Sequence, residues 1–535
     1  MTQSSESQTS SHSRLFFFYL LFTAFTCGGL IMVIEVLGSR VIGPFFGVSL
    51  FIWTSLIAVT MIALALGYAF GGQLSDRHDT PEALYTIIFI AGLLVLGIPF
   101  AKAGVLKLCV PMGLRLGSFI SSSILFGPPL FLLGCVSPYL IKIAARELNS
   151  LGRTVGGFYA LSTIGSVVGT ALTGFVLIAY LGVDQIFQLV GILLIGISVG
   201  YFVIFRRFYA ALTVLVLVFF VVPSKSENAL VKIMEDGTQA SLVASHDSHY
   251  GNLKVVDYKF EQAHIRELII DGLVQGGIDM VSGLSFYEYS YFLEQLPFAL
   301  NPQGKNCLVI GLGAGVIPRW YEAQGIKTDV VDIDESVLDF AREHFNFKLQ
   351  GEVYIQDARY FLRTQKKAYD YVVLDVFNGD TTPAHLLSLE ALQLVADKLT
   401  HNGVLGINLA GSVGREPYMT ASVVKTLKQV FDQVEIYPTF DPEKGDGSGN
   451  LVIVAYTGQQ RTLDLRKAQT AKVHPMVQEI FFSRLNQQFR FPESTEAIIL
   501  TDNYNPVDFY DAWLRESVRQ KIIQGTDWDI LMYSS

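Results

Sequence analysis

Long apolar runs in the first part of the chain constrain its fold more than any other feature. A helix needs about 20 mostly apolar residues to cross a bilayer, and most of these runs approach or exceed that length. We therefore predict a polar tail over residues 1–14 and a polytopic transmembrane helical bundle over residues 15–223, with about seven spans. The count becomes six or eight if the short last run does not span or if the prolines of the fourth run divide it. The runs lie at residues 15–37, 46–71, 83–101, 117–145, 155–180, 183–205 and 208–223.

Single residues inside these runs predict local features of the bundle. Pro128 and Pro129 are expected to kink or break the fourth span, because proline removes a helical hydrogen bond. The small residues Gly165, Gly169 and Gly174 indicate close packing between helices. Glu35 lies inside a span, where an acid is costly, and we expect an ion pair, with Arg40 five residues away as the nearest candidate.

Charge separates the two halves of the chain. Residues 1–223 hold 11 Lys and Arg against 7 Asp and Glu, and the remainder holds 28 against 41. The acidic second half lacks the clustered Lys and Arg that phosphate binding needs, so we expect no nucleic-acid partner. The four cysteines are scattered without the Cys and His spacing of a metal site, so we predict neither bound metal nor a disulfide framework.

The pattern changes after Pro223. Residues 224–300 show short alternating segments with turn signals, which predict a small β unit. From residue 301 to 535, strands alternate with helices, which predicts a parallel, doubly wound α/β sheet of the Rossmann-like type. Three more strands are expected near the end of this domain, followed by a polar helical tail from about residue 460.

A glycine-rich turn follows the first predicted strand of this domain, in the segment VIGLGAGVIP. Gly311, Gly313 and Gly315 lie between the strand and a helix, where backbone N–H groups can approach a ligand without interference from Cβ atoms. The turn lacks the third spaced glycine of dinucleotide-binding motifs. Adenosine joined to a sulfonium therefore fits better than a nicotinamide dinucleotide, because no pyrophosphate has to be held.

Acidic residues end the next two predicted strands. Asp332 follows the glycine turn by about 20 residues, where a carboxylate accepts hydrogen bonds from ribose hydroxyls. Asp357 and Ala358 end the third strand, where the adenine edge is expected. Asp334 is expected to be the N-cap of the following helix. Three such features at the carboxyl ends of successive strands predict one nucleoside-binding crevice.

These motifs, in this order, resemble the spermidine synthase family. The membrane half also resembles the transmembrane module of bacterial proteins in which several spans are fused to a spermidine synthase-like domain. In the soluble half the resemblance rests on SHYGNLKVVDY, RELIIDGLVQ, VIGLGAGVIPRW, VVDIDESV, YIQDARYFL and YDYVVLDVFNGDTTP; in the membrane half it rests on CGGLIMVIEVLGSRVIG, ALALGYAFGGQLSDR and YALSTIGSVVGTALTGFVLIAYLG.

The resemblance implies aminopropyl transfer from decarboxylated S-adenosylmethionine to a diamine, with release of methylthioadenosine. Asp375 is then the catalytic acid beside the transferred carbon, where a carboxylate deprotonates or orients the attacking amine. Tyr287 is expected to assist it. Gln275 joins the glycine turn, Asp332, Asp357 and Ala358 on the nucleoside, and Tyr250, Asp271, Asn378 and Asp380 are the expected substrate residues.

Three departures from the family pattern keep other reactions open. Ala314 stands where the family has an Asp that pairs with the amine of decarboxylated S-adenosylmethionine, Gly251 replaces a Gln, and Asn378 replaces an acid. One alternative is therefore an enzyme that acts on intact S-adenosylmethionine, as a lyase or a methyltransferase. A second is a nucleoside- or polyamine-binding transporter or sensor without turnover.

The expected partners are a polyamine or S-adenosylmethionine as small-molecule substrate and a lipid bilayer, and the resemblance also implies a homo-oligomer. We expect a multi-pass protein of the bacterial inner membrane. The distribution of Lys and Arg places the N-terminus in the cytoplasm, and an odd number of spans would then export the second half. Because S-adenosyl nucleosides are made in the cytosol, we predict a cytosolic catalytic domain.

Overall fold

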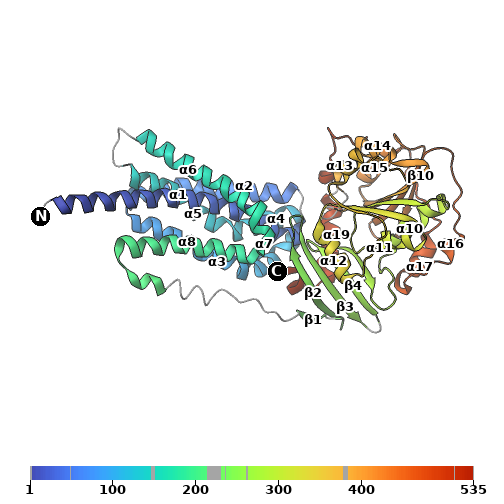
Figure 1. The fold of residues 1–535 in the computed structure, drawn as a ribbon, viewed down its shortest axis with the longest axis horizontal. Coiled ribbons are helices and arrows are strands. Elements are labelled where there is room, and N and C mark those ends of the chain that lie inside the picture. The colour runs from blue at the N-terminus through green and yellow to red at the C-terminus, as the bar shows by residue number, and fades with distance from the viewer. Residues whose placement is uncertain are drawn as a thin grey trace. The chain divides into compact units, whose positions relative to one another are not determined.

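The computed structural model describes residues 3–47, 50–145, 151–213, 230–234, 236–260, 263–377, 383–510 and 512–533. The chain divides into two compact units, Met1–Asn228 with Ser534–Ser535, and Ala229–Tyr533 (Figure 1). The predicted boundary between the small β unit and the α/β domain falls inside the second unit, and the domain limits remain predictions.

The first unit is helical. Six helical stretches among the described residues are long and apolar enough to cross a membrane: Arg14–Phe46, Leu50–Arg77, Pro81–Leu125, Gly127–Ala144, Leu151–Tyr180 and Val183–Arg206. The seventh predicted run, 208–223, lies mostly outside the described residues. The helices are α1 (Gln3–Phe46), α2 (Leu50–Arg77), α3 (Pro81–Cys109), α4 (Gly113–Leu125), α5 (Gly127–Ala144), α6 (Leu151–Leu172), α7 (Ile178–Tyr180) and α8 (Val183–Arg206).

Proline breaks the fourth predicted span as expected. Helix α4 ends at Leu125 and α5 begins at Gly127, with the two prolines in its first turn. Proline is tolerated there because the first N–H groups of a helix have no intrahelical acceptor. The predicted break is therefore confirmed.

Glycines bring α1 and α6 into backbone contact. A Cβ atom on Gly165 would lie 2.0 Å from the carbonyl oxygen of Phe25, and one on Gly169 would lie 2.3 Å from that of Gly29. No side chain fits in these gaps, so the predicted close packing is confirmed at these two positions. It was wrong for Gly174, whose Cβ position has no atom within 4 Å.

The charges in this unit pair differently from the prediction. Lys102 of α3 lies 2.6 Å from Asp184 at the start of α8, and Lys102 is 7% exposed. Among the described residues, no ion pair joins Glu35 to Arg40, so Arg40 is not the partner of Glu35.

The second unit begins with a five-stranded antiparallel sheet. Its strands follow the order of the chain. Asp271 and Gly272 connect the last two strands with positive φ angles of 48° and 77°, the geometry of a type I′ hairpin turn. The strands are β1 (Val231–Ile233), β2 (Gln239–Asp247), β3 (Asn252–Phe260), β4 (Ala263–Ile270) and β5 (Leu273–Asp279).

A seven-stranded sheet follows, in the order β11-β12-β10-β9-β6-β7-β8. Five strands run parallel in a doubly wound order, as predicted. β12 alone runs antiparallel to its neighbours, because the short β11–β12 connection has no room for a crossover helix. The strands are β6 (Asn306–Ile310), β7 (Lys327–Asp332), β8 (Val353–Ile355), β9 (Tyr369–Leu374), β10 (Leu399–Ser412), β11 (Gln433–Pro438) and β12 (Ser448–Tyr456).

Alternation along the strands builds two cores, one on each face of this sheet. In β6, Cys307 and Val309 join the core beneath α10, α11 and α12, whereas Leu308 and Ile310 join the core beneath α13, α14 and α15. The two groups of helices cover opposite faces of the sheet (Figure 1). They are α10 (Glu288–Leu300), α11 (Val316–Ala323), α12 (Glu335–His344), α13 (Ala358–Thr364), α14 (Leu389–Ala396) and α15 (Tyr418–Leu427).

The predicted polar helical tail is confirmed. It consists of short helices: α16 (Arg466–Gln469), α17 (Pro475–Arg484), α18 (Val507–Tyr510), α19 (Ala512–Gly525) and α20 (Trp528–Met532). Ile530 of α20 is fully buried against the small sheet.

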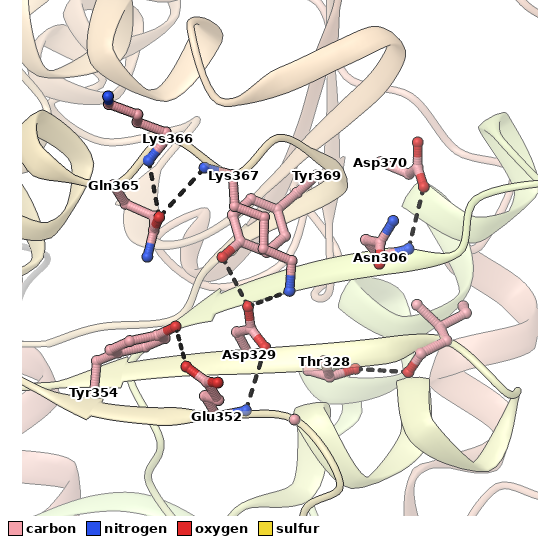
Figure 2. A network of polar contacts seen from close by, with 12 residues as sticks. Asn306, Thr328, Asp329, Glu352, Tyr354, Gln365, Lys366, Lys367, Tyr369 and Asp370 are labelled. Carbon is pink, nitrogen blue, oxygen red and sulfur yellow. Dashed lines mark hydrogen bonds and ion pairs between the residues drawn. The ribbon is translucent and has the colours of Figure 1, made fainter.

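A buried carboxylate joins three strands of the large sheet at the edge where β7 and β9 begin (Figure 2). Asp329 of β7 accepts hydrogen bonds from Lys367 Nζ at 2.5 Å and from the Tyr369 hydroxyl at 2.8 Å. It also accepts one from the backbone N–H of Glu352, next to β8, at 3.2 Å. The Asp329 side chain is 1% exposed, so these donors replace its lost hydration.

Asp329→Ala is expected to lower the free energy of unfolding of the second unit by about 3 kcal/mol, because it leaves the buried Tyr369 hydroxyl and the Lys367 ammonium without their acceptor. Thermal unfolding of the purified protein in detergent measures this. Glu352→Gln is the control, because its exposed side chain bonds only Tyr354 and its loss costs less than about 0.5 kcal/mol. Equal melting of the two variants would contradict the role of Asp329.

Candidate functional site

A cavity of about 640 Å³ lies at the carboxyl ends of β6, β7, β8 and β9. Ligands of doubly wound sheets bind at this edge, where the loops after neighbouring strands diverge. Ten of the thirteen predicted site residues line the cavity: Tyr250, Asp271, Gln275, Tyr287, Gly311, Gly313, Asp332, Asp357, Ala358 and Asp375. Gly315 does not line it but precedes α11, and Asn378 and Asp380 lie outside the described residues.

The glycine turn packs directly against neighbouring backbone. Gly311 has a φ of +94°, and a Cβ atom there would lie 2.1 Å from the carbonyl oxygen of Asp375. Gly313 has a φ of +51°, and a Cβ atom there would lie 2.6 Å from the carbonyl oxygen of Gln275. Only glycine permits both approaches. The turn therefore holds Asp375 and Gln275 at the cavity.

Asp332 is fixed by backbone donors. One of its carboxylate oxygens accepts from the N–H of Leu312 at 2.8 Å and the other from the N–H of Asp334 at 2.9 Å. Burial raises the pKa of Asp332 to about 6, although these two hydrogen bonds favour the charged form. A carboxylate has about four acceptor sites, so lone pairs remain for ligand hydroxyls.

The two acids that follow are helix caps as well as cavity residues. Asp357 accepts from the N–H of Tyr360 at 2.8 Å and begins α13. Asp334 accepts from the N–H of Ser336 at 3.0 Å, which confirms the predicted cap of α12. Asp334 also accepts from the Ser248 hydroxyl at 2.5 Å, which ties the small sheet to the large one at the cavity.

Asp375 is held by a chain of two asparagines. Asn408 of β10 donates to the Asp375 carboxylate at 2.9 Å, and Asn450 of β12 donates to the Asn408 side-chain oxygen at 3.0 Å. Loss of hydration in the cavity raises the pKa of Asp375 to about 6, and the Asn408 hydrogen bond opposes this rise. Both asparagines line the cavity and were missed from the sequence, although Asn408 is a polar residue inside the otherwise apolar strand GVLGINLA.

Two neighbouring tyrosines lie in different environments. The Tyr287 hydroxyl donates to Glu267, a buried carboxyl of β4 whose pKa burial raises to about 7. Tyr289 also lines the cavity, and burial together with the charge of Asp375 raises its pKa well above its usual value. Tyr287 was predicted from the sequence, whereas Tyr289, whose pKa the charge of Asp375 helps to raise, was missed.

The described part of the cavity wall is acidic. It includes six carboxyl groups and no Lys or Arg. Such a wall favours a cationic ligand, because ligand and site potentials are then complementary. The six groups belong to Asp271, Glu288, Asp332, Asp334, Asp357 and Asp375.

The positions that depart from the family pattern have little space. A Cβ atom on Gly251 would lie 2.9 Å from a carboxylate oxygen of Asp271, so a longer side chain there requires the Asp271 side chain to shift. Ala314 is 3% exposed and does not line the cavity. Within the described ranges, no group of three or more His, Cys, Asp or Glu residues is arranged to hold a metal ion.

The C-terminal tail contributes one wall of the cavity. Val518 and Ile522 of α19 line it, and the Arg519 guanidinium between them donates to the carbonyl oxygen of Asp271 at 2.5 Å. The sequence analysis did not place this helix at the site, because its contacts join residues more than 200 positions apart.

The domain that bears this cavity is similar to known proteins. Residues 287–461 match the family described as the spermine/spermidine synthase domain. A polyamine aminopropyltransferase of Vibrio vulnificus is 29% identical over 221 residues, which cover 39% of this chain and 70% of that protein. A polyamine aminopropyltransferase of Alkaliphilus metalliredigens is 29% identical over 214 residues, covering 38% and 72%.

Two methyltransferases and a solved structure of a probable spermidine synthase are also similar to this chain. An N-terminal histidine N-methyltransferase of Emericella nidulans is 31% identical over 196 residues, which cover 36% of this chain and only 34% of that protein. Among solved structures, a probable spermidine synthase from Corynebacterium glutamicum is 17% identical with a TM-score of 0.38, covering 42% of this chain and 84% of that chain. Human methyltransferase-like protein 13, in complex with SAH, is 21% identical with a TM-score of 0.28, covering 38% and 92%.

Proposed function

The chain carries a spermidine synthase domain with polyamine aminopropyltransferases among its homologues, and from this premise we propose that it is a membrane-bound aminopropyltransferase. Its substrates in this proposal are decarboxylated S-adenosylmethionine and a diamine, and its products are a longer polyamine and methylthioadenosine. The acidic cavity around Asp375 is the observation that supports it most, because both substrates are cations.

The bonds, electron pair and proton of the proposed transfer are all accounted for by the two substrates and Asp375. The neutral amine nitrogen of the diamine attacks the carbon beside the sulfonium and forms an N–C bond. The C–S bond breaks, and its electron pair returns to sulfur, which leaves as methylthioadenosine. The proton released from the amine passes to the Asp375 carboxylate, and Asn408 holds that carboxylate in place. In this proposal the Tyr289 hydroxyl orients the attacking amine beside Asp375, while Tyr287 positions the wall through Glu267.

The other cavity residues hold the nucleoside in this proposal. The free lone pairs of Asp332 accept from the ribose hydroxyls, Asp357 and Ala358 face the adenine edge, and Gln275 with the glycine turn contacts the chain that carries the sulfur. Tyr250 and Asp271 complete the wall beside Val518 and Ile522 of α19. Asn378 and Asp380 remain predicted substrate residues.

We also propose that the protein crosses the bacterial inner membrane six times. Six spans return the chain to the side on which it began, so a cytoplasmic N-terminus and a cytosolic catalytic domain agree with one another. An alkaline phosphatase fused to the cytosolic C-terminus is then expected to be inactive in intact cells. An active fusion would refute this topology. The membrane in this proposal is the anchor of the enzyme.

Ala314 favours a second candidate, an enzyme that acts on intact S-adenosylmethionine. A buried alanine offers no carboxylate to pair with a free aminopropyl ammonium, and it does not repel a substrate carboxylate. In the lyase form, the substrate's own carboxylate oxygen attacks the carbon beside the sulfonium, the C–S bond breaks, and homoserine lactone leaves with methylthioadenosine. Mass spectrometry of products from intact S-adenosylmethionine alone distinguishes this candidate, since the transferase forms neither homoserine lactone nor methylthioadenosine from that substrate.

Asp375→Asn is expected to lower kcat at least about 100-fold, because the amide cannot accept the proton of the attacking amine. Mass spectrometry of spermidine and methylthioadenosine, formed from decarboxylated S-adenosylmethionine and putrescine, measures the rate. Asp339→Asn, on the exposed face of α12, is the control and should keep the full rate. Unchanged turnover in Asp375→Asn would contradict the assignment of the base.

The rate is expected to fall as the pH drops through about 6, because burial raises the pKa of Asp375 to about 6 and only its carboxylate form accepts a proton. Above that pH the carboxylate is ionised and this limb of the profile is flat. Initial rates with saturating substrates between pH 5 and pH 8 measure it. Glu267→Gln should leave this acid limb in place; its disappearance in that variant would assign the limb to Glu267, whose pKa is raised to about 7.

A further inference from the structure

A second cavity of about 560 Å³ lies between α10, α11 and the segment that contains α16. It shares no lining residue with the first cavity, and its volume is that of a small-molecule site. Part of its wall is apolar, formed by Leu284, Val316, Trp320, Ala323 and Ala471.

Two buried polar side chains of α10 face this cavity. Glu294 and Gln295 both line it, and each is 3% exposed. Within the described residues, no hydrogen bond joins the Glu294 carboxyl or the Gln295 amide to the protein, and their polar atoms are accessible from the cavity. Buried polar groups are nearly always hydrogen-bonded, because burial without a partner is costly. The Glu294 carboxyl and the Gln295 amide are therefore available to bond a molecule that enters the cavity.

Three cations stand around the same cavity. Arg319 of α11 donates to the carbonyl oxygen of Gly283 at 3.2 Å, and Lys467 lies with its ammonium 4.5 Å from the centre of the Phe298 ring. Lys472 is the third. Burial raises the pKa of Glu294 well above its usual value, and the charge of Arg319 only partly opposes this. Among the described lining residues, Glu294 is the one acid, and Arg319, Lys467 and Lys472 are the cations.

These charges select the ligand class. A polyamine would bring more positive charge against Arg319, Lys467 and Lys472, and a simple anion would leave Glu294 unpaired. A zwitterion can pair its positive group with Glu294 and its negative group with the three cations. We propose that this cavity binds an α-amino acid with an apolar side chain, whose ammonium donates to Glu294 and Gln295. Its carboxylate faces the three cations, and its side chain packs against Trp320 and the neighbouring apolar residues.

The site does not depend on the proposed reaction. Its lining residues come from residues 283–285, from helices α10 and α11 with the adjacent Gln324, and from residues 467–472, which lie beyond the matched domain. Binding measurements therefore test this site independently of the proposed reaction.

Isothermal titration of the full-length protein in detergent tests the ligand class with three matched probes. L-leucine carries both charges, L-leucinamide lacks the carboxylate, and 4-methylpentanoate lacks the ammonium. L-leucine is expected to bind with one site per chain, and each analogue about 30-fold more weakly or not detectably, since each leaves a buried or facing charge unpaired. Failure of L-leucine to bind, or equal binding of either analogue or of putrescine, would overturn the proposal.

Two variants locate the site. Glu294→Gln keeps the shape of the side chain and should weaken L-leucine about 30-fold. Lys472→Met, at an exposed position, should weaken L-leucine but leave the residual binding of L-leucinamide unchanged, and it serves even if the buried change harms folding. Asp375→Asn should keep the affinity for L-leucine. Loss of binding in Asp375→Asn, with none in Glu294→Gln or Lys472→Met, would place L-leucine in the first cavity and refute the second site.

Discussion

The approach of Gly311 to the backbone of Asp375 is the constraint on which the candidate active site depends. The Asp375 N–H donates to Ile310 at 2.9 Å, the Gly311 N–H donates to Val331 at 2.8 Å, and no Cβ atom fits between Gly311 and Asp375. The ends of β6, β7 and β9 are thereby locked at one place. Because the same turn positions the N–H of Leu312 on Asp332, the carboxylates of Asp332 and Asp375 are held by one turn.

The charges around Asp375 determine which ligands the cavity favours. Asp375 lies among five other carboxyl groups, and its hydrogen bond from Asn408 leaves acceptor capacity for an incoming amine. Burial raises the pKa values of Asp375 and Asp332 to about 6, so both remain mostly ionised near neutral pH, although they lie in a partly dehydrated cavity. A cationic sulfonium nucleoside and an amine complement this arrangement. The second cavity has the opposite balance, with three cations around one buried acid, which is why we assign it a different ligand.

Much of this architecture could be predicted from local patterns in the sequence. Apolar runs predicted the helical half, and the alternation of strands with helices predicted the parallel sheet. Glycine and acidic residues at strand ends predicted most of the residues that line the cavity, because these signals are local to one strand and its following turn. Tyr287 was predicted and Tyr289 was missed, since the two residues are only two positions apart and tertiary packing alone separates their surroundings. Asn408, Asn450 and α19 were missed because strand pairing and tail packing bring them to the site from far along the chain.

The most direct test of this account is a structure of the full-length protein with methylthioadenosine bound. The account predicts adenine beside Asp357 and Ala358, the ribose hydroxyls on Asp332, and the sulfur on the side of the cavity that faces Asp375 and Tyr289. A nucleoside bound elsewhere, or bound in this cavity with its sulfur directed away from Asp375, would contradict it.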